Sequence, residues 1–203
     1  GRGVDFERGK ELGRDFDAES LGRRVDKGFY ATGAWKRPVL GFDGEEFTEF
    51  GLEFLVEVNK WMNKKKRENV IVIGGGNVAM DVAVTAKRLG AKSVTLIFRK
   101  PENELTASRE EIERAKEEGV QIMPQWGVKR ALYKDGQVTG MELKRTFYTR
   151  DEKGKLVLHY DEDETTIVNA DSVLMAAGQQ VDLSFLGDYA SARGRLVVDE
   201  ESQ

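Results

Sequence analysis

The fold is decided by the stretch from Asn69 to Lys100, which reads NVIVIGGGNVAMDVAVTAKRLGAKSVTLIFRK. Its apolar run VIVI is typical of a strand buried on both faces of a parallel sheet. Glycines follow, and apolar residues then recur at helical spacing until Gly90. A second apolar run, SVTLIF, ends on the basic residues Arg99 and Lys100. This order of strand, glycine turn, helix and strand predicts a parallel βαβ unit with a right-handed crossover.

The glycine turn fits the dinucleotide-binding pattern G-x-G-x-x-A, with Gly74, Gly76 and Ala79 at its three fixed positions. The first glycine permits a tight turn, the second lets the backbone approach a pyrophosphate, and the third small residue lets the helix pack on the strand. The helix N-terminus then offers free N–H groups and a partial positive charge to the phosphates. Between a strand and a helix, the pattern favours a dinucleotide site over a glycine-rich turn without a ligand.

The basic pair predicts which dinucleotide binds. In NAD-binding units an acid near the end of the second strand, about 20 residues after the glycines, holds the ribose 2′-hydroxyl. Arg99 and Lys100 occupy this place here. An acid would repel a 2′-phosphate, whereas an arginine can bond it with two parallel hydrogen bonds. We therefore predict NADP(H) as the ligand, with a solvated basic turn as the alternative.

The rest of the chain continues the alternation and then departs from it. The segment SREEIERAKEEG predicts a second helix with a capping box formed by Ser108 and Glu111, and VQIM predicts a third strand. Asp135 and Gly136 then lie between two apolar runs, which is a strong hairpin signal. KLVLHY extends this hairpin ahead of the last strand, SVLMAAG. The predicted fold class is α/β, a Rossmann-like parallel βαβαβ sheet with an inserted antiparallel β-meander.

Three smaller features complete the secondary structure. Residues 48–66 read as a helix, because apolar residues recur there at helical spacing, at Leu52, Leu55, Val58 and Met62. The acidic run at 161–164 reads as a solvated loop. The single histidine, His159, lies in KLVLHY and reads as an ordinary strand residue.

The composition excludes several classes of function. The chain has 203 residues with 39% hydrophobic residues, enough for a globular core, and no run near the roughly 20 apolar residues of a membrane span. Its net charge of −4 gives no reason to expect nucleic acid or an anionic membrane as partner. It contains no cysteine, which excludes a disulfide scaffold and iron–sulfur ligation by this chain. We expect a cytoplasmic protein.

Several segments together resemble a known family. VIVIGGGNVAMD, FRK, SREEIERAKEEGV and ADSVLMAAGQQVDLSFL are similar to the NADPH-binding domain of the small (β) subunit of bacterial glutamate synthase. The large subunit of NADH-dependent ferredoxin:NADP oxidoreductase and part of dihydropyrimidine dehydrogenase are related to it. GRDFDAESLGRRVDKGFYATGA resembles the end of the FAD domain in the same flavoproteins. The chain departs from the pattern at Lys100, where relatives often carry a second arginine, and at Leu105 and Thr106, where they often carry Met-Pro.

The resemblance implies both a function and a set of site residues. Such enzymes pass hydride from NADPH to FAD, and electrons then reach a glutamate synthase large subunit or another iron–sulfur partner. Arg99 and Lys100 would hold the 2′-phosphate. Asp81 would face the contact between nicotinamide and flavin, unless it is only an acid favoured by the helix dipole. The remaining cofactor-binding positions are backbone ones, Gly74, Gly75, Gly76, Asn77, Val78 and Ala79 at the pyrophosphate and Ala177 and Gly178 after the last strand. No catalytic residue and no metal ligand is assigned.

The resemblance also implies how the chain is divided. Residues 1–46 would be a remnant of an FAD-binding domain, 47–187 an NADP-binding domain, and 188–203 the start of a returning FAD-domain segment. We therefore expect a piece of a longer flavoprotein that binds NADP, with FAD bound only by the full-length protein and no activity in the piece alone.

Two other functions stay open. One is a self-contained NADP-dependent dehydrogenase of a small substrate, as in the shikimate dehydrogenase family, which needs a Lys–Asp pair in a substrate domain ahead of the glycine turn. The first 46 residues look too short and rich in turns for such a domain. The other is a non-catalytic NADP-binding module. Turnover without added flavin would favour the dehydrogenase.

Overall fold

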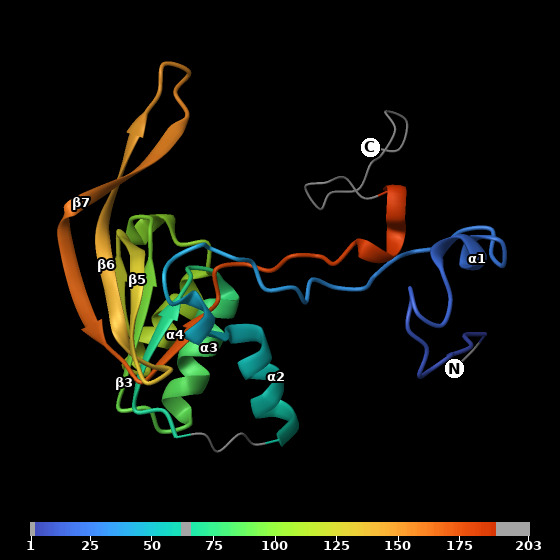
Figure 1. The fold of residues 1–203 in the computed structure, drawn as a ribbon, viewed down its shortest axis with the longest axis horizontal. Helices are drawn as coiled ribbons and strands as arrows, with labels where there is room; N and C mark the ends of the chain where they lie inside the picture. The colour runs from blue at the N-terminus through green and yellow to red at the C-terminus, as the bar shows by residue number, and fades with distance from the viewer. Residues whose placement is uncertain (1–2, 62–65, 190–203) are drawn as a thin grey trace. The chain divides into compact units, whose positions relative to one another are not determined.

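The computed structural model describes residues 3–61 and 66–189, and the chain forms two compact units (Figure 1). We call residues 37–178 the sheet unit, and the described parts of 1–36 and 179–203 the flanking unit. The limits predicted for the NADP-binding domain, 47 and 187, differ from these borders. The assignment of this domain and of the FAD-domain remnants stays a prediction.

A parallel five-stranded sheet forms the centre of the sheet unit. Its strands stand in the order β1-β8-β2-β3-β4, with every neighbouring pair parallel. The strand bounds are β1 Glu49–Phe50, β2 Asn69–Ile73, β3 Ser93–Phe98, β4 Gln121–Pro124 and β8 Ser172–Met175. Pro124 lies in β4, an edge strand, where its missing N–H removes no ladder hydrogen bond from the interior of the sheet.

Alternating residues of the central strands face two different layers. Val70 and Val72 of β2 join a buried cluster with the three helices, which are α2 Gly51–Trp61, α3 Asn77–Arg88 and α4 Arg109–Glu117. Ile71 and Ile73 face the opposite way and pack against the inserted antiparallel sheet. Because both faces of β2 are covered, its sequence is continuously apolar. The predicted α/β fold with an inserted meander is confirmed.

The inserted sheet has three antiparallel strands in the order β5-β6-β7. Their bounds are β5 Trp126–Lys134, β6 Gln137–Arg150 and β7 Leu156–Asn169. Asp135 and Gly136 connect β5 to β6 with φ angles of 52° and 75°. Two consecutive positive φ angles characterise the type I′ turn, which matches the twist of the strands. The hairpin predicted from this dipeptide is confirmed.

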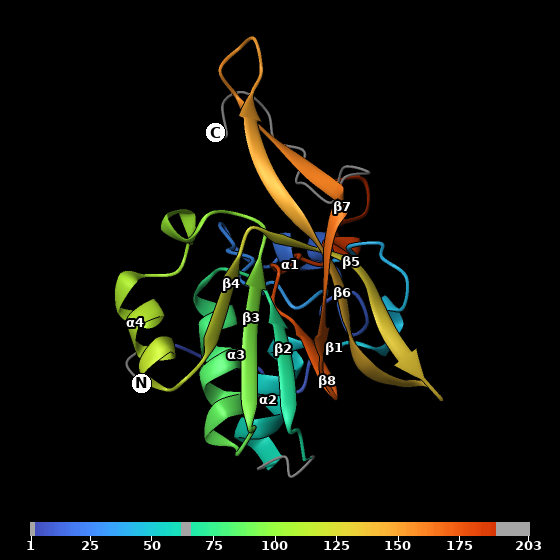
Figure 2. The same ribbon diagram turned by 90° about the vertical axis from the view of Figure 1, so that its left-hand side faces the viewer.

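Strands β6 and β7 continue beyond the end of β5 as a two-stranded arm, which we define as residues 146–160. Figure 2 shows the arm projecting past the rest of the sheet unit. His159 lies in β7, as predicted, where its ring stacks on that of Phe147 with 5.2 Å between the centroids. Its Nε2 atom lies 2.7 Å from Oγ1 of Thr149. These residues occupy one face of the arm, and Thr146 and Tyr160 share the other.

Two predicted elements were wrong in extent or type. The helix predicted for 48–66 begins only at Gly51, because the two residues before it pair with β8 as strand β1. Residues 62–65, including Met62, lie outside the described residues. The acidic run 161–164 is not a loop between elements but a bulge inside β7.

The bulge explains why the acidic run misled the prediction. Lys144 pairs with Thr165 while the next residue, Arg145, pairs with Asp161, so the residues between the two partners are extra. The Asp161 carboxylate accepts hydrogen bonds from the N–H groups of Asp163 and Glu164, at 3.0 and 3.2 Å. A bulge interrupts the alternation by which a strand is recognised in sequence.

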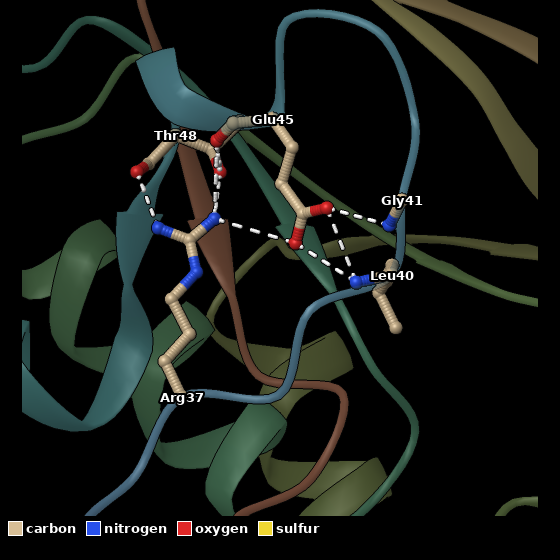
Figure 3. Close-up of polar contacts among 5 residues, drawn as sticks. All are labelled: Arg37, Leu40, Gly41, Glu45 and Thr48. Atoms are coloured by element: carbon tan, nitrogen blue, oxygen red, sulfur yellow. Dashed lines mark hydrogen bonds and ion pairs between the residues drawn. The ribbon is translucent and has the colours of Figure 1, made fainter.

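A partly buried ion pair closes the segment 37–48, at the start of the sheet unit, on itself (Figure 3). The Arg37 guanidinium donates to the carbonyl oxygens of Thr48 and Glu45, at 2.8 and 3.1 Å, and lies 3.7 Å from the Glu45 carboxylate. That carboxylate accepts hydrogen bonds from the N–H groups of Leu40 and Gly41. The segment joins the rest of the sheet unit through the Asp43 carbonyl, which accepts a hydrogen bond from the Ala131 N–H at 2.8 Å.

The flanking unit has little regular structure. It contains helix α1, Ala18–Gly22, which is capped by the Asp17 carboxylate, and a 3₁₀ helix, Ser184–Tyr189. Its two segments meet where Lys36 and Gln180 exchange backbone hydrogen bonds of 3.0 and 2.9 Å. Within residues 3–36 and 179–186, no side chain is buried.

None of the helices that the structure describes has the length and apolar character that a membrane span requires. In the same described part of the chain, no group of His, Cys, Asp and Glu side chains is arranged to hold a metal ion.

Candidate functional site

The candidate site lies at the carboxyl ends of β2, β3 and β8. The chain order reverses beside β2, since β3 and β4 lie on one side of it and β8 and β1 on the other. In open α/β sheets, ligands bind outside the carboxyl ends of the strands at such a reversal. Gly74 follows β2 directly, and Ile73 is in register with Ile97 of β3 and Met175 of β8. The turns after all three strands therefore meet at one edge.

Gly74 is required by the fold itself. Its φ angle is +152°, and a Cβ atom there would lie 2.3 Å from the carbonyl oxygen of Ala176. The Gly74 N–H donates to the carbonyl of Ile97 at 3.0 Å, and the Ala176 N–H donates to the carbonyl of Ile73 at 2.8 Å. The turn is thus joined to both neighbouring strands, and a side chain at this position would separate it from β8.

Gly75 and Asn77 are braced by the segment before α4. The carbonyl of Gly75 accepts from the N–H groups of Thr106 and Ala107, both at 3.1 Å, and from the Thr106 hydroxyl at 3.2 Å. The Asn77 side-chain oxygen accepts from the Ser108 N–H at 2.9 Å. What Asn77 can offer a phosphate is therefore its main-chain N–H. Sequence reasoning missed this brace, because partners about 30 residues apart leave no local pattern.

The predicted capping box of α4 is only half present. The Ser108 hydroxyl accepts from the Glu111 N–H at 3.3 Å, as a capping box requires. The Ser108 N–H, however, donates to Asn77 and not to Glu111. The Glu111 carboxylate instead lies 3.5 Å from the Arg114 guanidinium. The cap of α4 thus ties the two helix N-termini together.

Gly76 differs from Gly74 because the fold leaves room for a side chain there. It is the N-cap of α3, with an extended backbone at φ −100°, and it makes no side-chain cap. A Cβ atom at Gly76 would meet only the Thr106 hydroxyl, at an ordinary contact distance of 3.5 Å. Helix N-caps favour Asn, Asp and Ser, whose side chains satisfy the first helical N–H groups, over Thr and Gly. Packing therefore gives no reason for glycine at this position.

The N-terminus of α3 is open to an anion. The first helical N–H groups, those of Asn77 and Val78, have no acceptor inside the helix. The first turn contains no acidic residue. Ala79 is fully buried beneath the turn, as the small third position of the pattern requires. Free N–H groups and the helix dipole together favour binding of a phosphate.

The basic pair lies at the same edge, directly after β3. Arg99 and Lys100 are both exposed. The Arg99 guanidinium lies 3.5 Å from the Tyr160 hydroxyl, and the Lys100 ammonium lies 3.7 Å from the Glu104 carboxylate. Burial raises the pKa of the nearby Tyr148 phenol, and the positive charge of Arg99 acts against that rise.

Of the other predicted site residues, Ala177 and Gly178 lie at this edge and Asp81 lies farther along α3. Ala177 and Gly178 follow β8, are exposed, and pass the edge as backbone, with Gly178 at φ +115°. Asp81 is exposed on α3, one helical turn after Asn77. The structure therefore brings the glycine turn, the basic pair and Ala177–Gly178 together. Their roles toward a nucleotide stay predictions, as does the role of Asp81.

A family described as pyridine nucleotide-disulphide oxidoreductase matches residues 4–203 in sequence. The chain belongs to this family. Enzyme subunits are among its curated relatives. The NADPH-Fe(3+) oxidoreductase subunit beta of Geobacter sulfurreducens is 34% identical over 193 residues, which are 92% of this chain and 29% of that protein. The glutamate synthase [NADPH] small chain of Halomonas elongata is 32% identical over 216 residues, covering 98% of this chain and 46% of that protein.

These relatives confirm the resemblance inferred from the motifs, and the chain spans less than half the length of either. Solved structures of low identity share the fold. One is the FprA protein of Mycobacterium tuberculosis in complex with NADPH, with a TM-score of 0.79 at 14% identity. The match covers 93% of this chain and 58% of the FprA chain. Thioredoxin reductase of T. acidophilum matches 83% of this chain and 50% of its own, with a TM-score of 0.60 at 22% identity.

Proposed function

We propose that this chain is the NADPH-binding domain of a flavin-dependent oxidoreductase of the glutamate synthase small-subunit type. The observation that carries the proposal is Gly76, where the fold tolerates a side chain but the sequence has none. A close approach of a ligand to the backbone accounts for the glycine. Relatives whose names include NADPH support the choice of ligand.

The residues at the edge fit NADP. The uncapped N-terminus of α3 suits the pyrophosphate, and Ala79 keeps the helix close beneath it. Arg99 and Lys100, one strand away, suit the 2′-phosphate. Ala177 and Gly178 supply backbone without bulky side chains after β8. In this arrangement, the chain binds and orients the nucleotide.

FAD is assigned to the full-length protein. In the described part of the chain, a glycine turn between a parallel strand and a helix occurs once, at Gly74–Gly76. When bound, NADPH supplies a hydride, and the flavin accepts it. Asp81 is proposed to face that contact. The chain by itself is expected to oxidise NADPH negligibly, because no flavin is held against the nicotinamide.

The physiological acceptor is proposed to be a glutamate synthase large subunit or another iron–sulfur partner, in the cytoplasm. Relatives that are named as a small chain or as subunit beta support a place in a larger complex. The two other functions, a self-contained dehydrogenase and a non-catalytic NADP-binding module, share the same nucleotide site. Dye reduction by NADPH without added flavin would favour the dehydrogenase.

Titration of NADPH and NADH by calorimetry tests the ligand. A hydrogen bond to a charged group contributes about 1.5–3 kcal/mol, so NADPH should bind roughly ten- to a hundredfold more tightly than NADH. Arg99→Ala should remove most of this preference and leave NADH binding nearly unchanged. Arg88→Ala is the control, because that arginine lies at the other end of α3. Equal affinities for the two nucleotides in the wild-type protein would contradict the assignment.

Gly76→Val tests the glycine turn. The first atom of the new side chain makes an ordinary contact with Thr106, so the protein should stay folded by circular dichroism. Binding of NADPH and NADH should both be lost, because the side chain occupies the space in front of the backbone. Retained affinity in a folded variant would show that this turn does not hold the phosphates.

A further inference from the structure

The inserted sheet fixes the backbone of the basic pair. Thr146 of β6 is fully buried, and its hydroxyl donates to the carbonyl of Arg99 at 2.6 Å. The Gln125 N–H donates to the carbonyl of Lys100 at 3.1 Å. The Thr146 N–H in turn donates to the carbonyl of Gln125 at 2.9 Å. Both basic residues are thus tied through their carbonyl groups to one corner of the inserted sheet.

The same corner reaches the Arg99 side chain. Tyr160 of β7 stands opposite Thr146 across the strands, so both side chains lie on one face of the arm. The Tyr160 hydroxyl lies 3.5 Å from Nη1 of Arg99. Its ring packs over Gly127, where a Cβ atom would lie 2.6 Å from the ring, and the Lys144 ammonium lies 4.6 Å from the ring centroid. The phenol that contacts Arg99 is therefore held in place.

An arginine held in this way is suited to recognise a phosphate. A free arginine side chain loses rotamer entropy when it is fixed, and fixing it beforehand reduces that cost on binding. The guanidinium has five N–H donors, so one contact with Tyr160 leaves the others for a ligand. The Lys100 ammonium lies 3.7 Å from the Glu104 carboxylate, which offsets part of its charge. We therefore assign the larger share of phosphate binding to Arg99.

We propose that the inserted antiparallel sheet is a specificity element for the 2′-phosphate, in which Thr146 and Tyr160 are positioning residues for Arg99. The inference rests on the proposed function, since it presupposes NADP at this edge. It assigns to β6 and β7 the positioning of Arg99, which neither the glycine turn nor the basic pair can provide alone. The sheet that covers one face of the core thereby also sets which dinucleotide is preferred.

Three variants test the proposal by calorimetry with NADPH, NADH and 2′,5′-ADP. Tyr160→Phe keeps the ring over Gly127 and removes only the hydroxyl. Thr146→Val removes the bond to the Arg99 carbonyl, and Thr146→Ser restores a hydroxyl. Each loss of a hydroxyl should weaken NADPH and 2′,5′-ADP about three- to tenfold, the range for one hydrogen bond. NADH should change less than about twofold, and Thr146→Ser should recover the wild-type preference.

The outcomes separate this inference from the proposed function. Tyr133→Phe, an exposed tyrosine of β5, is the control and should change nothing. If Arg99→Ala removes the preference for NADPH while Tyr160→Phe and Thr146→Val keep it, the positioning role is wrong and the proposed function stands. Equal weakening of NADPH and NADH would also overturn the positioning role. If Arg99→Ala leaves the preference intact, the positioning role is wrong because Arg99 does not read the 2′-phosphate, whereas only equal affinities of the wild-type protein for NADPH and NADH would overturn the proposed function.

Discussion

Large apolar side chains are treated differently in the two units. In the sheet unit, Ile71, Leu96 and Leu174 are completely inaccessible to solvent between the layers. In the flanking unit, Phe29 is 97% exposed and Phe6 is 76% exposed. In the described part of the chain, the sheet unit encloses its large apolar side chains and the flanking unit leaves these rings in solvent.

The comparison teaches that, among the residues that the structure describes, only those of the sheet unit form a core. Burial of a phenylalanine contributes about 1.5–3 kcal/mol, and the flanking unit gains none of this at its exposed rings. The assignment of the flanking unit to an FAD-binding domain stays a prediction.

The largest expected effect comes from truncating the core. Leu174→Ala removes a side chain that is fully enclosed in the cluster shared with the helices, and should lower the free energy of unfolding by about 2–5 kcal/mol. Phe29→Ala should change it by less than about 0.5 kcal/mol, because that ring has little to lose. Urea unfolding followed by far-ultraviolet circular dichroism measures both.

Leu89→Ala provides a control inside the sheet unit, since that leucine is half exposed after α3 and should behave like Phe29→Ala. A loss at Phe29 as large as that at Leu174 would break the comparison. It would mean that the flanking unit has a core which its exposed rings do not reveal.

A smaller effect is expected at the border of the sheet unit. Glu45→Gln removes the charge that pairs with Arg37 and turns an amide toward backbone N–H groups that need an acceptor. The loss of stability should be roughly 1–3 kcal/mol. Glu46→Gln, at the exposed neighbouring position, is the matched control and should be neutral. Equal stabilities of the two variants would place residues 37–48 outside the cooperative part of the sheet unit.

The smallest expected effect is a pH dependence at the start of β2. Hydrogen bonds from Lys66 and, second, from Lys92 lower the pKa of Glu68 to about 2. Because the folded pKa lies below the unfolded one, Glu68 stabilises the fold above its ordinary pKa, and this contribution is lost as the pH falls toward 2. Melting temperatures of the wild type and Glu68→Gln should therefore differ slightly at pH 7 and converge near pH 2. A difference that stays constant would assign the effect to something other than ionisation.

Local patterns in the sequence predicted much of the sheet unit. Patterns over a few residues predicted the apolar runs of β2 and β3 and the turn at Asp135 and Gly136. The order of strand, glycine turn, helix and strand predicted that the glycine turn and Arg99 lie at the same edge of the sheet. Strand β1 was missed because it has two residues, Glu49 and Phe50, too few for a periodic signal. The bulge at 161–164 was missed because it breaks the alternation of β7.

The long-range contacts of the site could not be predicted in the same way. Ser108 donates to Asn77, and Thr146 donates to the carbonyl of Arg99, across 31 and 47 residues of sequence. Neither pair has a characteristic spacing, because the distance along the chain depends on the loops and on the whole inserted sheet. The sequence indicated which residues lie at the ends of single elements, but not the hydrogen bonds by which other elements hold those residues in place.

Gly74 and Gly76 stand two positions apart in one motif, yet they answer to different constraints. The approach of Ala176, directly after β8, requires a glycine at Gly74, whereas the fold leaves room for a Cβ atom at Gly76, so that only the proposed ligand would require a glycine there. A descendant of this protein that had abandoned its ligand would therefore keep the first glycine and let the second drift toward an ordinary N-cap residue such as serine. Under the proposed function, a glycine at the first position would report only that the fold is kept, and a glycine at the second that the nucleotide still binds.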